Sequence, residues 1–261
     1  MFALAFVALA GFAAIAKAKT PPPPMGKADE KAAAVAAQLD NALGGMSAWG
    51  SVPYVRFDFV VVKDGKEVAR FRHWWDKRHG MDRVEGPDDK GRMVAAIVNL
   101  QTRTGKSFTA GLPDRDSSEV AAQVDNAYQR WVNDSYWLMM PFKVRDPGTN
   151  LKYSGVKKGS NGVDYEVLEL TFDKGVGLTS GDHYWLYVNP KTHLMDKWDY
   201  LLESMKPPAA SATWEGWTKV GPVRFSTMHH FQGKPAHLQF ENVATPSSMD
   251  ESIFTDARPK Y

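Results

Sequence analysis

The apolar positions of the chain change spacing several times, and each change predicts a new element. The first patterned segment, residues 29–43, is rich in alanine. Its larger apolar residues, Val35, Leu39 and Leu43, are four positions apart, which is the spacing of one helical face. The pair Gly44-Gly45 follows directly, and glycine readily adopts the left-handed conformation that ends helices. We therefore expect an N-terminal helix over these residues.

The next segment has the two-residue period of a β-strand. Apolar side chains take every second position from Val55 to Val61. Asp64-Gly65 then supplies a turn signal, and residues 68–75 return as a second strand. Residues 93–100 form a further apolar run. Several successive strands joined by short polar turns predict an antiparallel sheet.

A helical period returns in residues 116–140. Its apolar positions share one helix face: Val120, Val124, Ala127, Tyr128, Trp131 and Val132. Asp116 and Glu119 fit a capping box, in which each side chain meets an unpaired amide of the first turn. Pro141 is expected to end this helix, because a proline ring clashes with the preceding turn. Residues 141–162 contain prolines and glycines and are expected to form a long loop.

The remaining sequence predicts a second run of strands. Extended segments are expected at residues 163–173, 183–189, 193–203, 212–220, 223–231 and 236–244. Turn signals lie at residues 189–192, 221–222 and 233–235. No internal repeat is present, and no linker-like stretch divides this part of the chain. The sequence thus predicts one domain that is mainly β with α, of the α+β class.

Composition and charge exclude several classes of protein. The chain has 32 Lys and Arg against 30 Asp and Glu, so its formal net charge is +2. Nucleic-acid-binding proteins normally show a strong basic excess, so no nucleic-acid partner is expected. The absence of cysteine excludes disulfides, thiolate nucleophiles and cysteine metal ligands. With 43% hydrophobic and 24% charged residues, the composition is that of an ordinary globular protein.

The first eighteen residues predict export to the periplasm. Phe2 to Ala16 is an uninterrupted apolar run, shorter than the ~20 residues that span a membrane. It ends in a small-x-small pattern suited to signal peptidase. We therefore expect a signal peptide over residues 1–18, a proline-rich linker over residues 19–27 and a single domain over residues 28–261. An uncleaved N-terminal anchor is the alternative. No later segment is long and apolar enough to cross a membrane.

Candidates for catalysis or metal binding are scattered. The chain has seven histidines: His73, His79, His183, His193, His229, His230 and His237. No H-E-x-x-H motif is present, although His229 and His237 could face each other across the turn at residues 233–235. We expect no metal, no cofactor and no catalytic residue. One alternative is a hydrolase that uses a cluster of histidines and an acid: His183, His193, His229 and Asp182.

Aromatic residues are the most informative feature. The chain has nine tryptophans, nine tyrosines and thirteen phenylalanines, many of them in expected strands. The segment Tyr184–Val188 is apolar on both faces, and such a strand is buried on both sides. The surplus predicts a strongly curved sheet with an apolar concave side, covered by the helix at residues 116–140. Two interpretations follow, a solid aromatic core or a cavity for an apolar ligand.

Two stretches carry a resemblance to a known family. Tyr187-Val-Asn-Pro-Lys-Thr-His-Leu194, followed by Lys197-Trp-Asp-Tyr200, resembles the strand–turn–strand signature V-D-P-x-T-x-L of LolA-like proteins, the outer-membrane lipoprotein-carrier superfamily. Asn189 stands where that signature has aspartate. The order of signal, N-terminal helix, strands, inserted helix and further strands is also similar. Residues 133–148 resemble an uncharacterised exported bacterial family near LolA.

The resemblance implies an open half-barrel, in which a curved antiparallel sheet has the N-terminal and inserted helices over its concave face and an acyl-chain site inside. It implies an exported, non-enzymatic binding or carrier protein for a lipid, a lipoprotein acyl chain or another apolar ligand. A structural or partner-binding module of the cell envelope is a further alternative. The aromatic residues expected to line the cavity are Phe59, Trp74, Trp131, Trp137, Trp185, Tyr187, Trp198, Tyr200 and Trp214.

Overall fold

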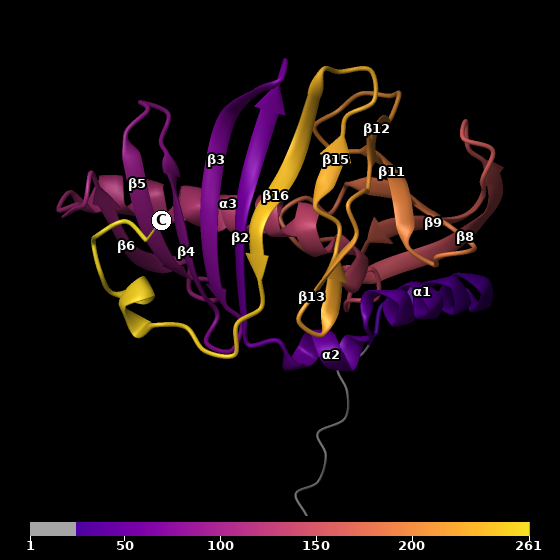
Figure 1. The fold of residues 1–261 in the computed structure, drawn as a ribbon, viewed down its shortest axis with the longest axis horizontal. Coiled ribbons are helices and arrows are strands. Elements are labelled where there is room, and N and C mark those ends of the chain that lie inside the picture. The colour runs from indigo at the N-terminus through magenta and orange to yellow at the C-terminus, as the bar shows by residue number, and fades with distance from the viewer. Residues whose placement is uncertain (1–24, 261) are drawn as a thin grey trace, which may run out of the picture.

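The computed structural model describes residues 25–260 of the chain. The expected signal peptide and most of the expected linker therefore lie outside the described residues. Within residues 25–260, no helix combines the length and the apolar character that crossing a membrane requires. The described part is mainly β, with two large sheets, one small hairpin and three α-helices (Figure 1). The expected fold class is confirmed.

The larger sheet has eight strands in the order β15-β16-β2-β3-β4-β5-β6-β7, and every neighbouring pair is antiparallel. Its strands are β2 (Tyr54–Lys63), β3 (Lys66–Asp76), β4 (Met81–Pro87), β5 (Met93–Asn99), β6 (Thr104–Thr109), β7 (Leu112–Pro113), β15 (Met228–His230) and β16 (Ala236–Ala244). The predicted hairpin is confirmed as β2 and β3. The predicted strand at residues 93–100 is confirmed as β5.

The smaller sheet has six strands in the order β1-β8-β9-β10-β11-β12, and only β1 and β8 run parallel. Its strands are β1 (Lys27–Ala28), β8 (Thr149–Lys158), β9 (Asp164–Phe172), β10 (His183–Val188), β11 (Met195–Leu201) and β12 (Ala210–Thr213). A separate hairpin consists of β13 (Thr218–Val220) and β14 (Val223–Phe225). The second predicted run of strands is confirmed, although residues 212–220 and 223–231 each contain parts of two strands.

The two sheets meet where β12 approaches β15. Isolated bridges pair Ala212 with Phe231 and Glu215 with Met228, so one curved surface continues from one sheet into the other (Figure 1). Four strand pairs contain bulges, which bend strands and increase their twist. The bulge of β8 includes Gly155, whose φ of 84° favours glycine. The surface does not close, which confirms the expected open half-barrel.

The long helix α3 (Ser117–Lys143) lies across one face of this curved surface (Figure 1). Asp116 caps its N-terminus, since the Asp116 carboxylate accepts hydrogen bonds from the amides of Ser118 and Glu119. Glu119 was expected to complete a capping box. Its carboxylate instead pairs with the guanidinium of Arg92 at 2.8 Å, which ties the start of α3 to the turn before β5.

The expected helix end at Pro141 is wrong, because α3 continues through this residue to Lys143. Proline has no N–H to donate to the carbonyl four residues earlier. Pro141 lies two residues before the end of α3, so the missing hydrogen bond affects only the last turn. Packing holds the last turn in place. Phe142 is buried, and its ring stacks on Trp49 with 4.9 Å between the ring centroids.

The expected loop over residues 141–162 is also wrong, since β8 occupies much of it and pairs with β9. The strand β4 was not expected at all. Both strands carry charged residues, and β4 buries three of them, Asp82, Arg83 and Glu85. Asp82 is paired with His73 of β3, and Arg83 is paired with Glu85 of β4 itself and with the Ile253 carbonyl of the C-terminal segment. A hydrophobicity pattern does not register such pairing.

The helix α1 (Glu30–Leu43) confirms the predicted N-terminal helix. The Asp29 carboxylate caps it by accepting from the amide of Ala32, and Gly44 ends it with a φ of 114°. A short helix, α2 (Met46–Ser51), follows. The buried face of α1 packs into the largest core cluster, which also contains residues of both sheets and of the C-terminal half of α3. This core occupies the concave side of the half-barrel.

The C-terminal segment crosses the other face of the larger sheet, in front of β4 to β6 (Figure 1). It contains a short 3₁₀-helix, η1 (Glu251–Phe254), and Phe254 packs against a cluster with Ile97 and Phe108. The buried guanidinium of Arg83 donates hydrogen bonds of 2.7 to 2.9 Å to three carbonyl oxygens of this segment, those of Ile253, Asp256 and Arg258. The sheet is therefore covered on both sides at this end.

Candidate apolar binding cavity

A cavity of about 470 Å³ lies between α3 and the smaller sheet. We call it the α3 cavity. The loop joining β9 to β10, residues 173–182, borders its mouth. Its aromatic lining consists of Tyr136, Trp137, Phe172, Tyr184, Trp198 and Tyr200. Small-molecule sites are typically apolar, concave and roughly 300–1,000 Å³ in volume, so the α3 cavity has the size and lining of a ligand site.

One face of α3 forms the roof of the cavity. The α3 residues that line it are Gln129, Val132, Asn133, Tyr136, Trp137 and, at the last position of the helix, Lys143. The first five are spaced by one, three or four positions, so they lie on one side of the helix. Asp134 and Leu138 lie on the other side and are fully buried. One side of α3 therefore packs into the core through residues such as Asp134 and Leu138, and the other side borders the α3 cavity.

The aromatic rings form a continuous wall centred on Trp198. The Trp198 ring centroid is 4.7 Å from that of Trp137, 5.0 Å from that of Tyr184 and 5.7 Å from that of Tyr200. Tyr136 packs on Tyr184 at 5.7 Å. Such tilted and stacked ring pairs each contribute about 0.5–1.5 kcal/mol beyond the area that they bury. The wall is thus preformed, and a ligand would not have to order it.

The β9–β10 loop is fixed at both ends and less bonded between them. At its start, the Asp173 carboxylate accepts from Lys27 Nζ and Asn150 Nδ2, each at 3.0 Å. At its end, Asp182 is held by hydrogen bonds from the Tyr184 hydroxyl and the Glu203 amide. Between them lie Gly175 and Gly177, with φ angles of 81° and 71° that favour glycine. This middle part borders the cavity mouth and is the part of the rim best able to move.

The polar groups of the cavity are mostly engaged with one another. The Asp182 carboxylate accepts three hydrogen bonds of 2.8 to 2.9 Å, from the Thr179 hydroxyl, the Tyr184 hydroxyl and the Glu203 amide. Lys143 Nζ, the cation that lines the cavity, lies 2.5 Å from an Asp146 carboxylate oxygen. Burial raises the pKa values of Tyr136 and Tyr184, and the Asp182 charge adds to both increases. Both hydroxyls therefore stay protonated as donors.

Three of the nine aromatic residues expected in a cavity line this one: Trp137, Trp198 and Tyr200. Three others lie in the core nearby without lining it. Trp214 packs behind Trp198 at 5.2 Å, Trp131 packs on Trp75 at 5.4 Å, and Phe59 packs on Phe240 at 5.6 Å. Their side chains support the wall or the larger sheet and do not border the cavity.

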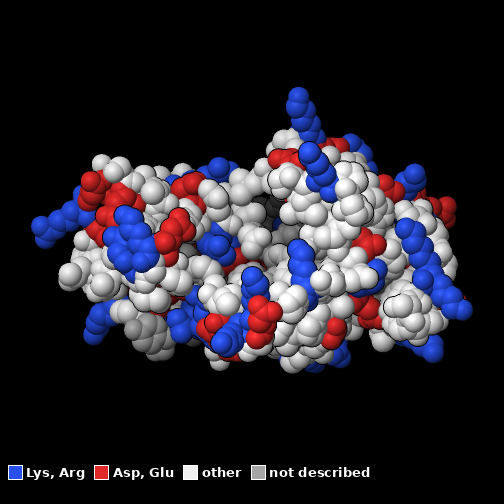
Figure 2. Space-filling view, turned by 90° about the horizontal axis from the view of Figure 1, so that it is seen from above, with Lys and Arg blue, Asp and Glu red and all other residues white. Residues whose placement is uncertain are grey.

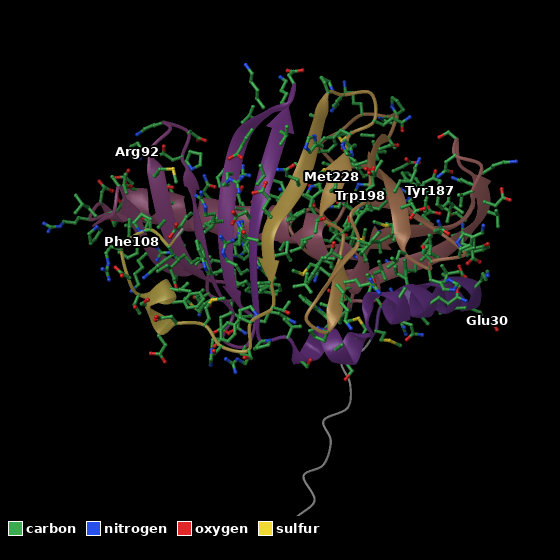
Figure 3. All side chains as sticks on the ribbon, in the orientation of Figure 1. Glu30, Arg92, Phe108, Tyr187, Trp198 and Met228 are labelled. Atoms are coloured by element: carbon green, nitrogen blue, oxygen red, sulfur yellow. The ribbon has the colours of Figure 1, made fainter. Side chains whose placement is uncertain are left out.

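The remaining three, Trp74, Trp185 and Tyr187, point to the opposite face of the sheets. Trp185 stacks on His183 at 4.0 Å, and the Tyr187 hydroxyl donates to Asp199 at 2.6 Å. The Trp74 ring lies 4.3 Å from the guanidinium carbon of Arg56. Tyr187 and Trp198 come from neighbouring strands, yet Trp198 lies nearer the centre of the molecule and Tyr187 nearer its end (Figure 3).

Sequence reasoning missed Tyr136, Phe172 and Tyr184. Tyr184 and Trp185 are adjacent on β10, so their side chains take opposite faces, and Tyr184 is the one that faces α3. Phe172 ends the strand before the β9–β10 loop. The available signal for Tyr136 was its position directly before Trp137, on the same side of α3.

The residues of the hydrolase alternative have separate partners. His183 Nε2 lies 2.8 Å from Glu169, whereas His229 Nδ1 lies 3.0 Å from the Thr213 carbonyl. Burial lowers the pKa of His229 to about 3, so this imidazole is neutral. Across the turn at residues 233–235, His237 pairs with His230, and the expected pairing with His229 is wrong. Among residues 25–260, no group of three histidines and acids could hold a metal ion.

A second polar group, the His73 cluster, lies under the middle of α3. His73 Nδ1 is 2.9 Å from Asp82 and His73 Nε2 is 3.2 Å from Asp134, and all three side chains are fully buried. Phe57 stacks on the imidazole at 4.6 Å. Burial alone would lower the pKa of His73, but the Asp82 charge and the bonds to both acids raise it to about 9. The cluster thus joins β3, β4 and α3 through a charged imidazole.

Surface charge follows the near-neutral balance of the sequence. On the face shown in Figure 2, acidic and basic side chains are interspersed, and neither sign dominates a large area. Several arginines are paired with acids. Arg70, for example, lies 2.7 Å from Glu241 and 2.9 Å from Asp58. This face offers no basic field to a polyanion.

Fold and cavity together define a class of protein, an open half-barrel of mainly antiparallel strands with a helix over its concave face and an aromatic-lined cavity beneath that helix. A model of a family of unknown function, DUF6503, matches residues 93–206 of the chain. Among curated proteins, none matches the chain.

Several solved structures are similar to the chain. A LolA superfamily protein from Nitrosomonas europaea is 14% identical, with a TM-score of 0.49, over 86% of this chain and 97% of that one. A DUF1329 family protein from Desulfovibrio piger is 14% identical, with a TM-score of 0.48, over 87% and 98%. The lipoprotein LppX from Mycobacterium tuberculosis is 10% identical, with a TM-score of 0.34, over 84% and 99%.

Proposed function

We propose that this protein is an exported, non-enzymatic carrier or binding protein that holds a lipid, a lipoprotein acyl chain or another apolar ligand in the α3 cavity. The observation that carries the proposal is the cavity itself, a volume of about 470 Å³ walled by six aromatic side chains under a helix. The LolA-like motif of residues 187–194 implies the same class of ligand. The signal peptide expected over residues 1–18 would deliver the domain, residues 28–261, to the periplasm.

The volume and lining suit a single hydrocarbon chain. A methylene group occupies roughly the 30 Å³ of a water molecule, so about fifteen would fill the α3 cavity. Burial of each methylene contributes about 0.8 kcal/mol, which gives a gross driving force on the order of 12 kcal/mol. Loss of ligand freedom and ordering of the β9–β10 loop offset part of this value. The remainder is sufficient for reversible binding, as a carrier requires.

The location of the aromatic residues favours this function over a partner-binding module. A docking surface would display its large rings to solvent. Here Trp198 and Trp214 are fully buried, and Trp137 packs on Trp198 beneath the helix. The outer aromatic residues Trp185 and Tyr187 are engaged with His183 and Asp199. The rings are thus concentrated around an internal volume.

The test is a binding measurement on gently purified protein. We expect native mass spectrometry and organic extraction to detect a bound lipid, and a fluorescent fatty-chain probe to bind saturably at one site. Val132→Trp places a large ring into the cavity from α3 and should weaken probe binding at least tenfold. Val156→Trp is the matched control, because Val156 is 60% exposed on β8. Absence of both bound lipid and saturable probe binding in the wild-type protein would contradict the proposal.

A further inference from the structure

Two tyrosine hydroxyls of the α3 cavity have no hydrogen-bond partner within residues 25–260. They belong to Tyr136 and Tyr200, whose side chains line the cavity. Neither hydroxyl is among the fully buried polar atoms that lack a partner, so both are open to the cavity. The indole N–H of Trp198 also lacks a partner among the described residues, but it is fully buried and does not open into the cavity. A hydroxyl group can donate a hydrogen bond, so a polar ligand atom inside the cavity can pair with each tyrosine.

The charged groups of the lining are already engaged. Asp182 accepts from Thr179, Tyr184 and the Glu203 amide. Asp146 is paired with Lys143. The uncharged polar groups that remain for a ligand are the two tyrosine hydroxyls and the side-chain amides of Gln129 and Asn133.

The net charge of the lining opposes an anion. Two carboxylates, Asp146 and Asp182, border the cavity, against the single ammonium group of Lys143, which Asp146 already neutralises. Inside a site of low dielectric constant, an uncompensated carboxylate repels a second negative charge strongly. Burial is the main cause of the raised pKa of Tyr136, and the charges of Asp182 and Asp146 add to the increase.

We propose that the α3 cavity selects a neutral single-chain lipid, such as an acyl ester, and that it discriminates against free fatty-acid anions. The hydroxyls of Tyr136 and Tyr200 donate to the ester oxygens, and Asp182 excludes the anion. This inference rests on the proposed function and names the ligand class of the same site. The ester is that of a free lipid or of an acylated polypeptide, because both present the same chemistry to the site.

The test compares three ligands with the same chain, methyl dodecanoate, dodecanoate and dodecane, in displacement of the fluorescent probe at pH 7.5. We expect the ester to bind at least tenfold more tightly than the anion and about three- to tenfold more tightly than dodecane, which leaves the donors unpaired. A dodecanoyl ester carried on a short peptide then separates the two sources. Equal affinity for the two esters identifies the acyl ester itself as the ligand.

Two variants assign the discrimination to residues. Tyr136→Phe should weaken ester binding about threefold to tenfold and leave dodecane binding unchanged. Tyr128→Phe is the matched control on the same helix, because Tyr128 does not line the cavity. Asp146→Asn should free Lys143 and improve dodecanoate binding several-fold without affecting the ester.

The outcomes separate this inference from the proposed function. If dodecanoate binds as tightly as the ester or more tightly, the selectivity is overturned and the carrier function stands. If Tyr136→Phe and Tyr128→Phe behave alike, the role of the Tyr136 hydroxyl is overturned. If none of the three ligands displaces the probe and no probe binds, the proposed function itself fails.

Discussion

The two halves of α3 rest on very different surroundings. Its N-terminal half lies on the larger sheet, where Val124 and Ala127 pack directly against Val84, Ala96 and Val98. Its C-terminal half faces the smaller sheet across the α3 cavity, with Tyr136 and Trp137 on the roof. Small side chains let a helix approach a sheet closely, whereas large rings hold it away. Side-chain size on the face that α3 turns to each sheet therefore decides where the helix packs closely and where it leaves a cavity. The opposite face of the C-terminal half is packed, since Leu138, Met140 and Phe142 belong to the largest core cluster.

The His73 cluster lies at the boundary between the two halves. It attaches α3 to β3 and β4 through Asp134. Asp134 lies about one turn before Trp137, which lines the cavity. A helix that borders an open volume gains less packing there, so it needs a strong attachment elsewhere. The comparison predicts that damage to the solid half reduces stability, whereas changes around the hollow half alter ligand binding.

The largest expected effect comes from breaking the attachment. Asp134→Ala leaves His73 buried with one acid fewer, and removal of one partner of a buried charge cluster typically costs about 3–5 kcal/mol. We expect urea denaturation to show a loss of that size in the free energy of unfolding. Asp125→Ala, at an exposed position of α3, is the control and should change it by less than about 0.5 kcal/mol. Equal losses would show that the cluster does not fasten the helix.

The next effect separates two tryptophans on neighbouring turns of α3. Trp131 packs on Trp75 away from the cavity, so Trp131→Ala should lower stability by about 3 kcal/mol and leave ligand affinity unchanged in the folded protein. Trp137→Ala removes part of the cavity wall and should weaken probe binding at least tenfold. Thermal unfolding and probe titration of both variants measure this. Loss of binding with Trp131→Ala in a folded protein would extend the cavity to that turn.

A smaller effect appears with pH. The folded-state pKa of His73 is about 9, above the ordinary histidine value of about 6.5. A raised pKa contributes stability that is complete below pH 6.5 and is lost as pH rises through 9. We expect a decrease on the order of 2–3 kcal/mol between pH 6.5 and 9.5, measured by urea midpoints. His73→Gln should lack this component, and Lys77, whose pKa is lowered to about 8 by burial, titrates in both proteins. Parallel pH profiles would contradict the assignment.

The smallest effect concerns the cavity rim. Gly177 has a φ of 71° and open space around its α-carbon, so Gly177→Ala costs only backbone strain, about 1 kcal/mol. We expect the β9–β10 loop to change its opening rate, which would alter the rate of probe release a few-fold without changing the α3 cavity. Stopped-flow displacement measures this rate. Gly65→Ala, at a comparable φ of 72° in the β2–β3 turn, is the control and should leave probe release unaffected.

Local patterns predicted much of the fold, because their signals lie within a few residues of one another. The spacing of Val35 and Leu39, the helix end at Gly44 and the Asp64-Gly65 turn all appear in the structure as expected. The strand β4 was not predicted, because its charged residues are buried against partners far away in the sequence. Arg83, for example, donates a hydrogen bond to the Ile253 carbonyl in the C-terminal segment. The extension of α3 past Pro141 likewise depends on the tertiary packing of Phe142.

The candidate site was harder to predict for a geometric reason. On a strand that is apolar on both faces, the sequence does not tell which face is concave. On β10, Tyr184 faces α3 while Trp185 and Tyr187 face outward, and all three are equally aromatic in the sequence. The His73 cluster was invisible for a different reason, since His73 and Asp134 are 61 positions apart. Their meeting depends on where α3 crosses the sheet.

The C-terminal segment has a practical consequence for anyone who handles the protein. The guanidinium of Arg83 is buried, and three backbone oxygens of the C-terminal segment accept its hydrogen bonds inside the fold. Truncation of the chain after Asp250 would remove these hydrogen-bond acceptors from Arg83. It would also expose Ile97 and Phe108 to solvent, and such an apolar patch promotes aggregation. Affinity tags and fluorescent labels therefore belong on the N-terminal side of the described residues, before Met25.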